Sequence, residues 1–402
     1  MSSSESVPVA IVGGGPVGLS LALGLARAGV RSVLLERKPT THEHSRAPAI
    51  HVRTREIFRQ WGIERTLLEA GTLVQQITLH TVEPGRPPRF TLDFRELDAE
   101  ADAPGILILE QSHTERLLRA AVQESGYCDL RFGCEAVGLA FHDRGARVEY
   151  RAGGDTEQVS AQFVAGCDGA SSFVRHALQL PFPGITYSLR PMLADVRIDD
   201  ARDTLPWPRM RNAADGLTVG LRLAPSLWRL IRLEPGKPSQ SDEVPEPELR
   251  ARVDDVLGPG AFQPVWASRF RIHRRASPRF VVGCVLLAGD AAHVHSPVGG
   301  LGMNGGIQDA ANLAWKLAAA LDDGDSERLL ASYETERRAV VVEKVSRYTD
   351  LLTRLFLQAP SALREATLGL FGTALRNRWI QRANLRDIGM IGFDYPASPV
   401  LN

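Results

Sequence analysis

One stretch near the N-terminus limits the fold more than any other. Between positions 8 and 38 a short apolar strand runs into a glycine-rich loop, a helix and a second strand that ends in an acid. Strand, loop, helix and strand in this order form the dinucleotide-binding half of a doubly wound α/β domain. The sequence therefore predicts a Rossmann-type domain, with strands at 9–12 and 32–35 and a helix at 17–28.

The loop of this stretch has the spacing G-x-G-x-x-G. Gly13 makes the tight turn, Gly15 admits the pyrophosphate to the helix N-terminus, and Gly18 lets helix and strand pack closely. Glu36 would accept hydrogen bonds from a ribose diol. The pattern predicts a bound nucleotide but does not separate FAD from NAD. The predicted contacts in this loop are Gly13, Gly15, Pro16, Val17, Gly18 and Glu36.

A second strand–loop–helix unit lies at 285–321. Its apolar strand ends at Asp290, and a loop with Pro297 and several glycines follows. After Asn304 apolar residues, Trp315 among them, recur at helical spacing, which predicts a helix with these residues in the core. The strand delivers a carboxylate, and bare amides at a helix start favour negative charge. Taken alone, the unit could also be an ordinary strand–loop–helix connection.

Three further places are candidates because they lie at ends of predicted elements. A strand ends at Asp168-Gly169, and a serine-capped helix carrying Arg175 follows. Gln111 stands between a strand and a helix, and Arg46 lies in the loop before another helix. Each has a simpler interpretation: a capped turn, a neighbour of a helix cap, and a solvated arginine.

The remaining pattern suggests a second sheet and a helical C-terminal part. Alternating residues around a proline-glycine turn at 73–97 predict a hairpin outside the nucleotide domain. Further strands are expected at 106–109, 130–137, 146–150, 192–198, 217–223 and 228–233, and helices at 112–124, 246–257 and across 326–382. The predicted division is 1–180 for the first part of the nucleotide domain, 181–279 for an inserted substrate-side sheet domain, and 280–402 for the return and the C-terminal helices.

Composition excludes several classes of partner. Lys+Arg and Asp+Glu both total 47, so no net field would attract nucleic acid or an anionic membrane. No apolar run is long enough to span a bilayer, and the N-terminus lacks a signal core, so we expect a cytoplasmic protein. His293 and His295 have no third ligand nearby, and the four cysteines form no CxxC pair, so no metal is expected.

Three motifs in fixed order carry a family resemblance: GGGPVG with its acid, CDGASSFVR, and GDAAH followed by P-x-GG-x-G-x-N. Together they resemble the single-component flavoprotein aromatic hydroxylases, which have the para-hydroxybenzoate hydroxylase fold. The runs RPMLADVRID and DYPASPVL are most similar to the phenol and polyketide hydroxylase branch. Many members of that branch carry a further thioredoxin-like domain, which this sequence lacks, so functions attached to that domain are not expected.

The resemblance implies an α/β fold in which a Rossmann-type FAD-binding domain holds an inserted β-sheet substrate domain and ends in a helical segment. It implies that Arg46, Gln111, Asp168, Gly169 and Asp290 join the glycine loop in binding FAD. Pro297, Gly302, Met303 and Asn304 would lie beside the flavin ring and stabilise its reduced, anionic form. NAD(P)H would visit a surface groove, because only one G-x-G-x-x-G of the sequence, at 13–18, directly follows a predicted strand.

The implied reaction is hydroxylation of a phenolic or polyketide ring through a flavin C4a-hydroperoxide, with NAD(P)H and O2 as co-substrates. We expect a small aromatic substrate as the main partner, and a monomer or homodimer. A Baeyer–Villiger or epoxidising flavin monooxygenase and a non-catalytic flavin-binding protein remain alternatives. A halogenase is disfavoured because no W-x-W-x-I-P motif is present and no lysine occurs between Lys38 and Lys237.

Overall fold

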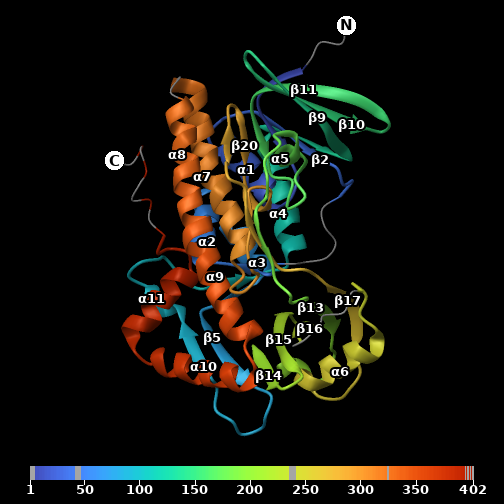
Figure 1. Cartoon of the computed structure of the whole chain (residues 1–402), viewed down its shortest axis with the longest axis vertical. Coiled ribbons are helices and arrows are strands. Elements are labelled where there is room, and N and C mark those ends of the chain that lie inside the picture. Colours follow the sequence, from blue (N-terminus) through green and yellow to red (C-terminus); the bar gives the residue numbers. More distant parts are fainter. Residues whose placement is uncertain are drawn as a thin grey trace.

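The chain folds around two large β-sheets. The structure, a computed structural model, describes residues 5–40, 47–234, 241–323 and 326–393, together with 395, 398 and 400. One sheet has eight strands and the other has seven. In Figure 1 the first lies in the upper half, with long helices alongside it, and the second lies in the lower half. This arrangement confirms the predicted α/β class, whereas the residue limits of the domains remain a proposal.

The eight-stranded sheet has a parallel core in the order β20-β11-β1-β2-β8. It includes the strands at which all three motifs begin. Parallel strands that are buried on both faces have continuous apolar sequences, as seen in the first strand. The members are β1 (Glu5–Val12), β2 (Ser32–Glu36), β8 (Cys128–Phe132), β9 (Cys134–His142), β10 (Gly145–Ala152), β11 (Asp155–Gly166), β19 (Val281–Val282) and β20 (Val285–Leu287).

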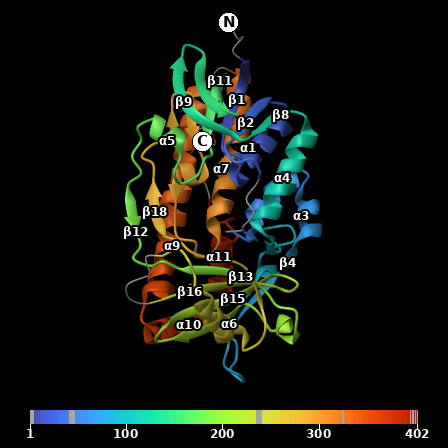
Figure 2. The ribbon, with the colours of Figure 1, turned by 90° about the vertical axis from the view of Figure 1, so that its right-hand side faces the viewer.

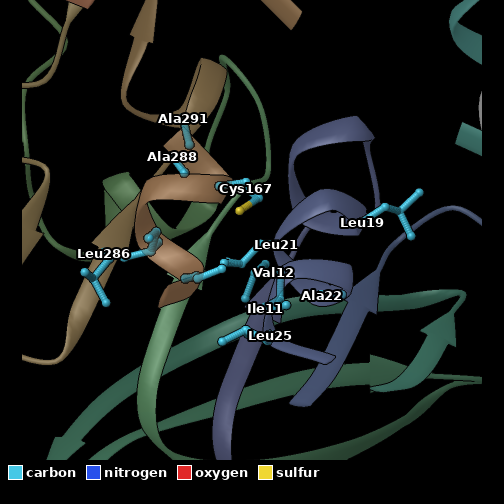
Figure 3. Packing of buried hydrophobic residues seen from close by; sticks show 14 of the residues in the cluster. Ile11, Val12, Leu19, Leu21, Ala22, Leu25, Cys167, Leu286, Ala288 and Ala291 are labelled. Atoms are coloured by element: carbon cyan, nitrogen blue, oxygen red, sulfur yellow. The ribbon is translucent and has the colours of Figure 1, made fainter. Parts of the chain in front are cut away.

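Helices cover this sheet, and two of them approach unusually closely. A Cβ at Gly24 of α1 would lie 2.7 Å from the Cβ of Ala314 on α7, so only glycine allows this contact. Figure 3 shows buried side chains of α1, β1 and β20, with Cys167 among them. The helices of this layer are α1 (Pro16–Arg27), α2 (Val52–Gln60), α3 (Glu64–Ala70), α4 (Gln111–Ser125), α5 (Phe173–Ala177), α7 (Leu301–Asp323) and α8 (Ser326–Arg338).

The seven-stranded sheet joins the predicted hairpin to the later strands. Its order is β17-β13-β16-β15-β14-β5-β6, so β5 and β6 extend the sheet although they lie far before its other strands in the sequence. One face packs against α6 (Glu246–Leu257). The strands are β5 (Gln76–Thr81), β6 (Phe90–Asp93), β13 (Met192–Arg197), β14 (Arg209–Ala213), β15 (Gly216–Ala224), β16 (Leu227–Leu233) and β17 (Gln263–Arg269).

Two small sheets connect the halves. One has the order β3-β7-β4 and the other the order β12-β18-β21. In the view of Figure 2, β12 and β18 run down the side of the molecule from the upper half towards the seven-stranded sheet. Their strands are β3 (Ala49–Ile50), β4 (Thr72–Val74), β7 (Ile106–Ile108), β12 (Gly184–Thr186), β18 (His273–Ala276) and β21 (His293–Val294).

The C-terminal part is helical, as predicted, but two π-helical segments alternate with the α-helices. Pro360 lies between the second π-helical segment and the next helix, where a proline can occupy the position before a helix start. The elements are η4 (Ala339–Val345), α9 (Ser346–Leu352), η5 (Thr353–Gln358), α10 (Ser361–Ala374) and α11 (Arg378–Ile388). No helix in the described part of the chain is both long and apolar enough to cross a membrane.

Two local predictions were wrong. The strand expected at 130–137 is two strands, β8 and β9, because Gly133 between them has a φ of +74° and turns the chain. Trp315, expected in the core, is 43% exposed, whereas its neighbour Lys316 is fully buried. Position on the helix, rather than hydrophobicity, decides which of the two faces inward.

Lys316 is buried because α8 supplies a partner. Its ammonium lies 2.7 Å from the carboxylate of Glu336, which also accepts from Asn312 at 2.6 Å and from Ser398 at 2.6 Å. Burial lowers the pKa of Lys316 to about 8, although Glu336 opposes this shift. The cluster ties α7 to α8 and to the C-terminal segment.

We expect Lys316→Met to lower the free energy of unfolding by about 3–5 kcal/mol, because it leaves the Glu336 carboxylate buried without its cation. Adding Glu336→Gln should recover part of this loss. Urea unfolding followed by circular dichroism measures both. Glu69→Gln, in the exposed pair with Arg65, is the control and should cost at most about 1 kcal/mol. A Lys316→Met protein as stable as the wild type would show that the pair contributes nothing.

Candidate active site

The first two motifs meet at the carboxyl ends of neighbouring strands. The Cys167 N–H donates to the Val12 carbonyl at 2.7 Å, which aligns the end of β11 with that of β1. A Cβ at Gly13 would lie 2.4 Å from the Cys167 carbonyl oxygen and 2.8 Å from the Cα of Asp168. Gly13 has a φ of +108°, so both its conformation and its space require glycine.

The third motif joins them through Val17. A Cβ at Gly289 would lie 2.8 Å from a Val17 methyl group, and one at Gly306 would lie 2.5 Å from it. The start of α1 therefore packs directly on the turn after β20 and on the first turns of α7. The structure thus brings the three predicted strand-end motifs to one edge of the sheet, where ligands of open α/β sheets bind.

Other glycines at this edge face open space. A Cβ at Gly15, Gly169 or Gly302 would meet nothing within 4 Å. Gly15 is the N-cap of α1 and has no side chain that could cap the helix. Pro16 follows at the first helical position. Gly302 lies in the first turn of α7. Since the first N–H groups of a helix have no intrahelical acceptor, both helix starts offer donors to a ligand that comes close to the backbone.

Glu36 ends β2 beside the first of these helix starts. Its carboxylate accepts from the Gly14 N–H at 2.6 Å and from the Lys38 N–H at 2.9 Å. A Cβ at Gly14 would lie 2.8 Å from the Cβ of Glu36, so the loop packs against the acid. The structure places Glu36 next to the glycine loop, as the fingerprint predicts.

Asp168 and Arg175 hold the second motif together. Asp168 Oδ2 accepts from the Val174 N–H at 3.1 Å, while its Oδ1 is buried without a hydrogen-bond partner. Burial raises the pKa of Asp168, and hydrogen bonds from Ser172 and the α5 backbone offset part of that rise. Arg175 is buried and donates to the Ala291 carbonyl at 2.9 Å. It therefore ties the second motif to the turn that follows β20.

Asn304 fixes the start of α7 from within. Its side chain is fully buried. The Oδ1 atom accepts from the His51 N–H at 2.8 Å, and the Nδ2 atom donates to the carbonyls of Ala49 at 2.8 Å and Gly300 at 2.9 Å. Asn304 therefore links β3, the glycine loop and α7, and its observed contacts are those of a positioning group.

The other predicted positions differ in how close they lie to this edge. Asp290 sits in the 3₁₀ turn after β20 and is exposed, as is Pro297. Met303, in the first turn of α7, is half-buried. Gln111 begins α4 and accepts from the Ala47 N–H at 3.2 Å. Arg46 lies outside the described residues.

The prediction missed a buried charged network beneath the third motif. Asp309 on α7 accepts from the Gly289 N–H at 3.0 Å, from His293 Nε2 at 2.6 Å and from Arg337 Nε at 2.6 Å. The side chains of Asp309, His293 and Arg337 are all buried. Arg337 also donates to the Gly305 carbonyl at 3.2 Å. The one available signal was the single ionisable residue in the helix stretch 307–314.

His293, considered as a metal ligand, is used in this hydrogen bond instead. Its Nε2 atom is the one that contacts Asp309, and its ring stacks on Phe280 with 5.7 Å between centroids. In the described part of the chain no group of three or more His, Cys, Asp or Glu residues could hold a metal ion.

We expect Asp309→Asn to lower the free energy of unfolding by about 3–5 kcal/mol at neutral pH, because Arg337 would lose its buried counter-charge. Burial alone would raise the pKa of Asp309, but His293 and Arg337 outweigh it and lower the pKa. The stability that the carboxylate provides is therefore full above its unfolded pKa, near 3.8, and is lost as the pH falls through the lower folded value.

The gap in stability between wild type and Asp309→Asn should accordingly be widest near neutral pH and narrow below about pH 4. Denaturant unfolding of both proteins across this range measures the gap. A gap that widens on acidification would contradict the ionised assignment.

Comparison with known proteins agrees with this geometry. The family model for the FAD binding domain matches residues 6–348. Pentachlorophenol 4-monooxygenase of Sphingobium chlorophenolicum is 30% identical over 408 residues, which covers 96% of this chain and 71% of the relative. The 12-dehydrotetracycline 5-monooxygenase/anhydrotetracycline 6-monooxygenase of Streptomyces rimosus is 32% identical over 391 residues, covering 92% of this chain and 75% of the relative.

A solved structure extends the likeness to the whole fold. The p-nitrophenol 4-monooxygenase of Pseudomonas putida superposes with a TM-score of 0.86 at 27% identity, covering 96% of this chain and 99% of that structure. The family model, the relatives and the fold all agree with the three motifs. The chain therefore belongs to the FAD-dependent aromatic hydroxylases with the para-hydroxybenzoate hydroxylase fold, and it is a flavin monooxygenase.

Proposed function

We propose that this enzyme inserts one oxygen atom from O2 into a phenolic or polyketide-type aromatic ring, with NAD(P)H as the electron donor. The observation that carries the proposal is the pair of open helix starts at one sheet edge, at Gly15 and Gly302, which suits one extended dinucleotide. The named relatives act on chlorophenol and tetracycline-type rings, which supports the substrate class.

The residues present fit FAD. In the proposed arrangement the start of α1 holds the pyrophosphate, Glu36 accepts from a ribose, and the exposed Asp290 serves the flavin-side half. The unpartnered Oδ1 of Asp168 and the space above Gly169 provide a further polar contact. When bound, FAD supplies the redox and oxygen chemistry, and the first turn of α7 stabilises negative charge on the ring without titrating.

The proposed substrate surface is the face of the seven-stranded sheet that turns away from α6. In Figures 1 and 2 this sheet lies between α6 and the upper half. Asp195 and Arg229 lie on this face and form a buried two-pronged ion pair with both distances at 2.8 Å, and Trp266 donates to Asp195 at 2.8 Å. Because these charges satisfy each other, the face suits a neutral ring better than a carboxylate.

Ring hydroxylation and Baeyer–Villiger insertion leave different products. Both incorporate an atom of O2, but the first leaves a new phenolic hydroxyl and the second a ring-expanded lactone. Turnover of a panel of phenols and tricyclic quinones under labelled dioxygen tests the proposal. We expect labelled phenolic product and NAD(P)H consumption stimulated by substrate. Unlabelled product would exclude oxygen transfer from O2, and labelled lactone would favour Baeyer–Villiger action.

A glycine substitution tests the nucleotide site without unfolding the protein. Gly15 has a φ of −77° and no atom within 4 Å of a built Cβ, so Gly15→Ala fits the fold without strain. Since the Cβ would occupy the space left for the pyrophosphate, we expect FAD affinity to fall at least about tenfold. Titration of the apoprotein with FAD, followed by flavin fluorescence, measures this.

Gly369→Ala is the matched control, because Gly369 lies on α10 and also has no atom near a built Cβ. It should leave FAD affinity unchanged and shift stability by at most about 1 kcal/mol. Equal FAD affinity in Gly15→Ala and wild type would place the nucleotide elsewhere.

A further inference from the structure

His51 is a buried histidine that the proposed reaction does not yet use. It follows β3 and is the N-cap of α2, and its side chain is 1% exposed. Its backbone N–H donates to Asn304 at the start of α7. Both ring nitrogens are buried, and neither makes a hydrogen bond of ordinary geometry. Buried polar atoms of this kind are rare and call for an explanation.

The ring lies against the glycine loop that leads into α7. A Cβ at Gly300 would be 3.4 Å from His51 Nε2, and the backbone of Gly299 and Gly300 faces the imidazole. The residue after Gly300 begins α7. His51 is therefore packed behind the helix start whose open side, at Gly302, we assign to the flavin.

Burial sets the charge of this ring. It lowers the pKa of His51 to about 4, and the Gly299 and Gly300 backbone offsets only part of that shift. The imidazole is therefore neutral near pH 7 and carries one N–H. The backbone of Gly299 and of Gly300 faces a ring that has one N–H to donate. A protonated ring has two N–H groups and could donate to both.

No other charge sets this value among the described residues. The segments at 49–50 and 299–300 carry no ionisable side chain, and Asn304 on α7 is neutral. Arg55, one turn along α2, is paired with Glu64 at 2.7 Å. The end of α11 also packs near this helix, because the Gly389 carbonyl accepts a hydrogen bond from the backbone of α2. The ionisable residues closest to Gly389 in the sequence are Arg386 and Asp387, and neither contributes to the pKa of His51.

We propose that His51 is a positioning residue of the flavin site that is neutral beside the oxidised cofactor and takes up one proton when the cofactor is reduced. Negative charge arriving at the start of α7 favours the imidazolium, which can donate from both ring nitrogens. His51 thus acts through the glycine loop. Its proton balances negative charge on the reduced flavin that the start of α7 would otherwise stabilise alone. The proposal rests on the flavin placement given under the proposed function.

The redox step balances without a further reactant. NAD(P)H gives a hydride, which brings two electrons and one proton to the bound flavin and leaves NAD(P)+. The additional proton comes from solvent and stays on His51. When oxygen reoxidises the flavin, the negative charge disappears and His51 returns this proton to solvent.

The midpoint potential of bound FAD against pH tests the proposal at equilibrium, without substrate turnover. We expect measurements from about pH 5 to about pH 8 to show two regimes in the wild type. At the acid end, reduction by two electrons should take up one proton more than at the alkaline end. The dependence of potential on pH should then weaken by half towards the alkaline end. His51→Gln, which keeps a donor and an acceptor but cannot ionise in this range, should follow the weaker dependence throughout.

Thr54→Val is the matched control, since Thr54 lies on the same helix, is fully buried and also has an unpartnered hydroxyl. It should keep the break of the wild type, that is, the change of slope in the plot of midpoint potential against pH. A break that persists in His51→Gln, or a wild type with no break, would overturn the proposal. A purely structural role would alter FAD affinity or stability in His51→Gln and leave the break in place. Failure of the wild type to bind FAD would instead contradict the proposed function.

Discussion

The candidate site depends on one buried carboxylate. Asp309 lies between the turn after β20, the histidine of β21 and an arginine of α8, and it accepts from all three. A buried anion is costly unless every lone pair is used, so this geometry is strongly determined. Because Asp309 belongs to the helix that starts at the proposed flavin site, the same residue fixes the turn carrying Asp290 relative to that helix start.

Close backbone approach completes what the carboxylate begins. Gly13, Gly289 and Gly306 each occupy a place where a Cβ would overlap a neighbouring segment, and Val17 fills the space left by the last two. The contrast with Gly15 and Gly302, which face open space, divides the glycines into two kinds. Some are needed for the protein to pack on itself, and others leave room for a ligand.

The backbone-determined features were the ones the sequence could predict. The glycine spacing, the strand-end acids Glu36 and Asp168, and helix 246–257 all follow from local patterns, and the structure has these elements. Asp309, Lys316 and His51 were missed because their burial depends on partners far away in sequence. A lysine is buried only where a residue such as Glu336 meets it, and no local pattern announces that meeting.

The same distinction separates the proposed cofactor site from the proposed substrate face. The flavin contacts proposed here use N–H groups and glycine gaps, which the fold itself positions and which tolerate little change. The sheet face opposite α6 instead presents the side chains of β-strands. Each of these side chains can be replaced without disturbing the backbone hydrogen bonds between the strands. The Asp195–Arg229 pair removes its own charge from that face, so under the proposed function shape and apolar contact would select the ring. Selection by shape alone discriminates weakly, by about 1–3 kcal/mol for each methylene. A site built in this way suits a family in which one oxygen chemistry serves many different aromatic rings.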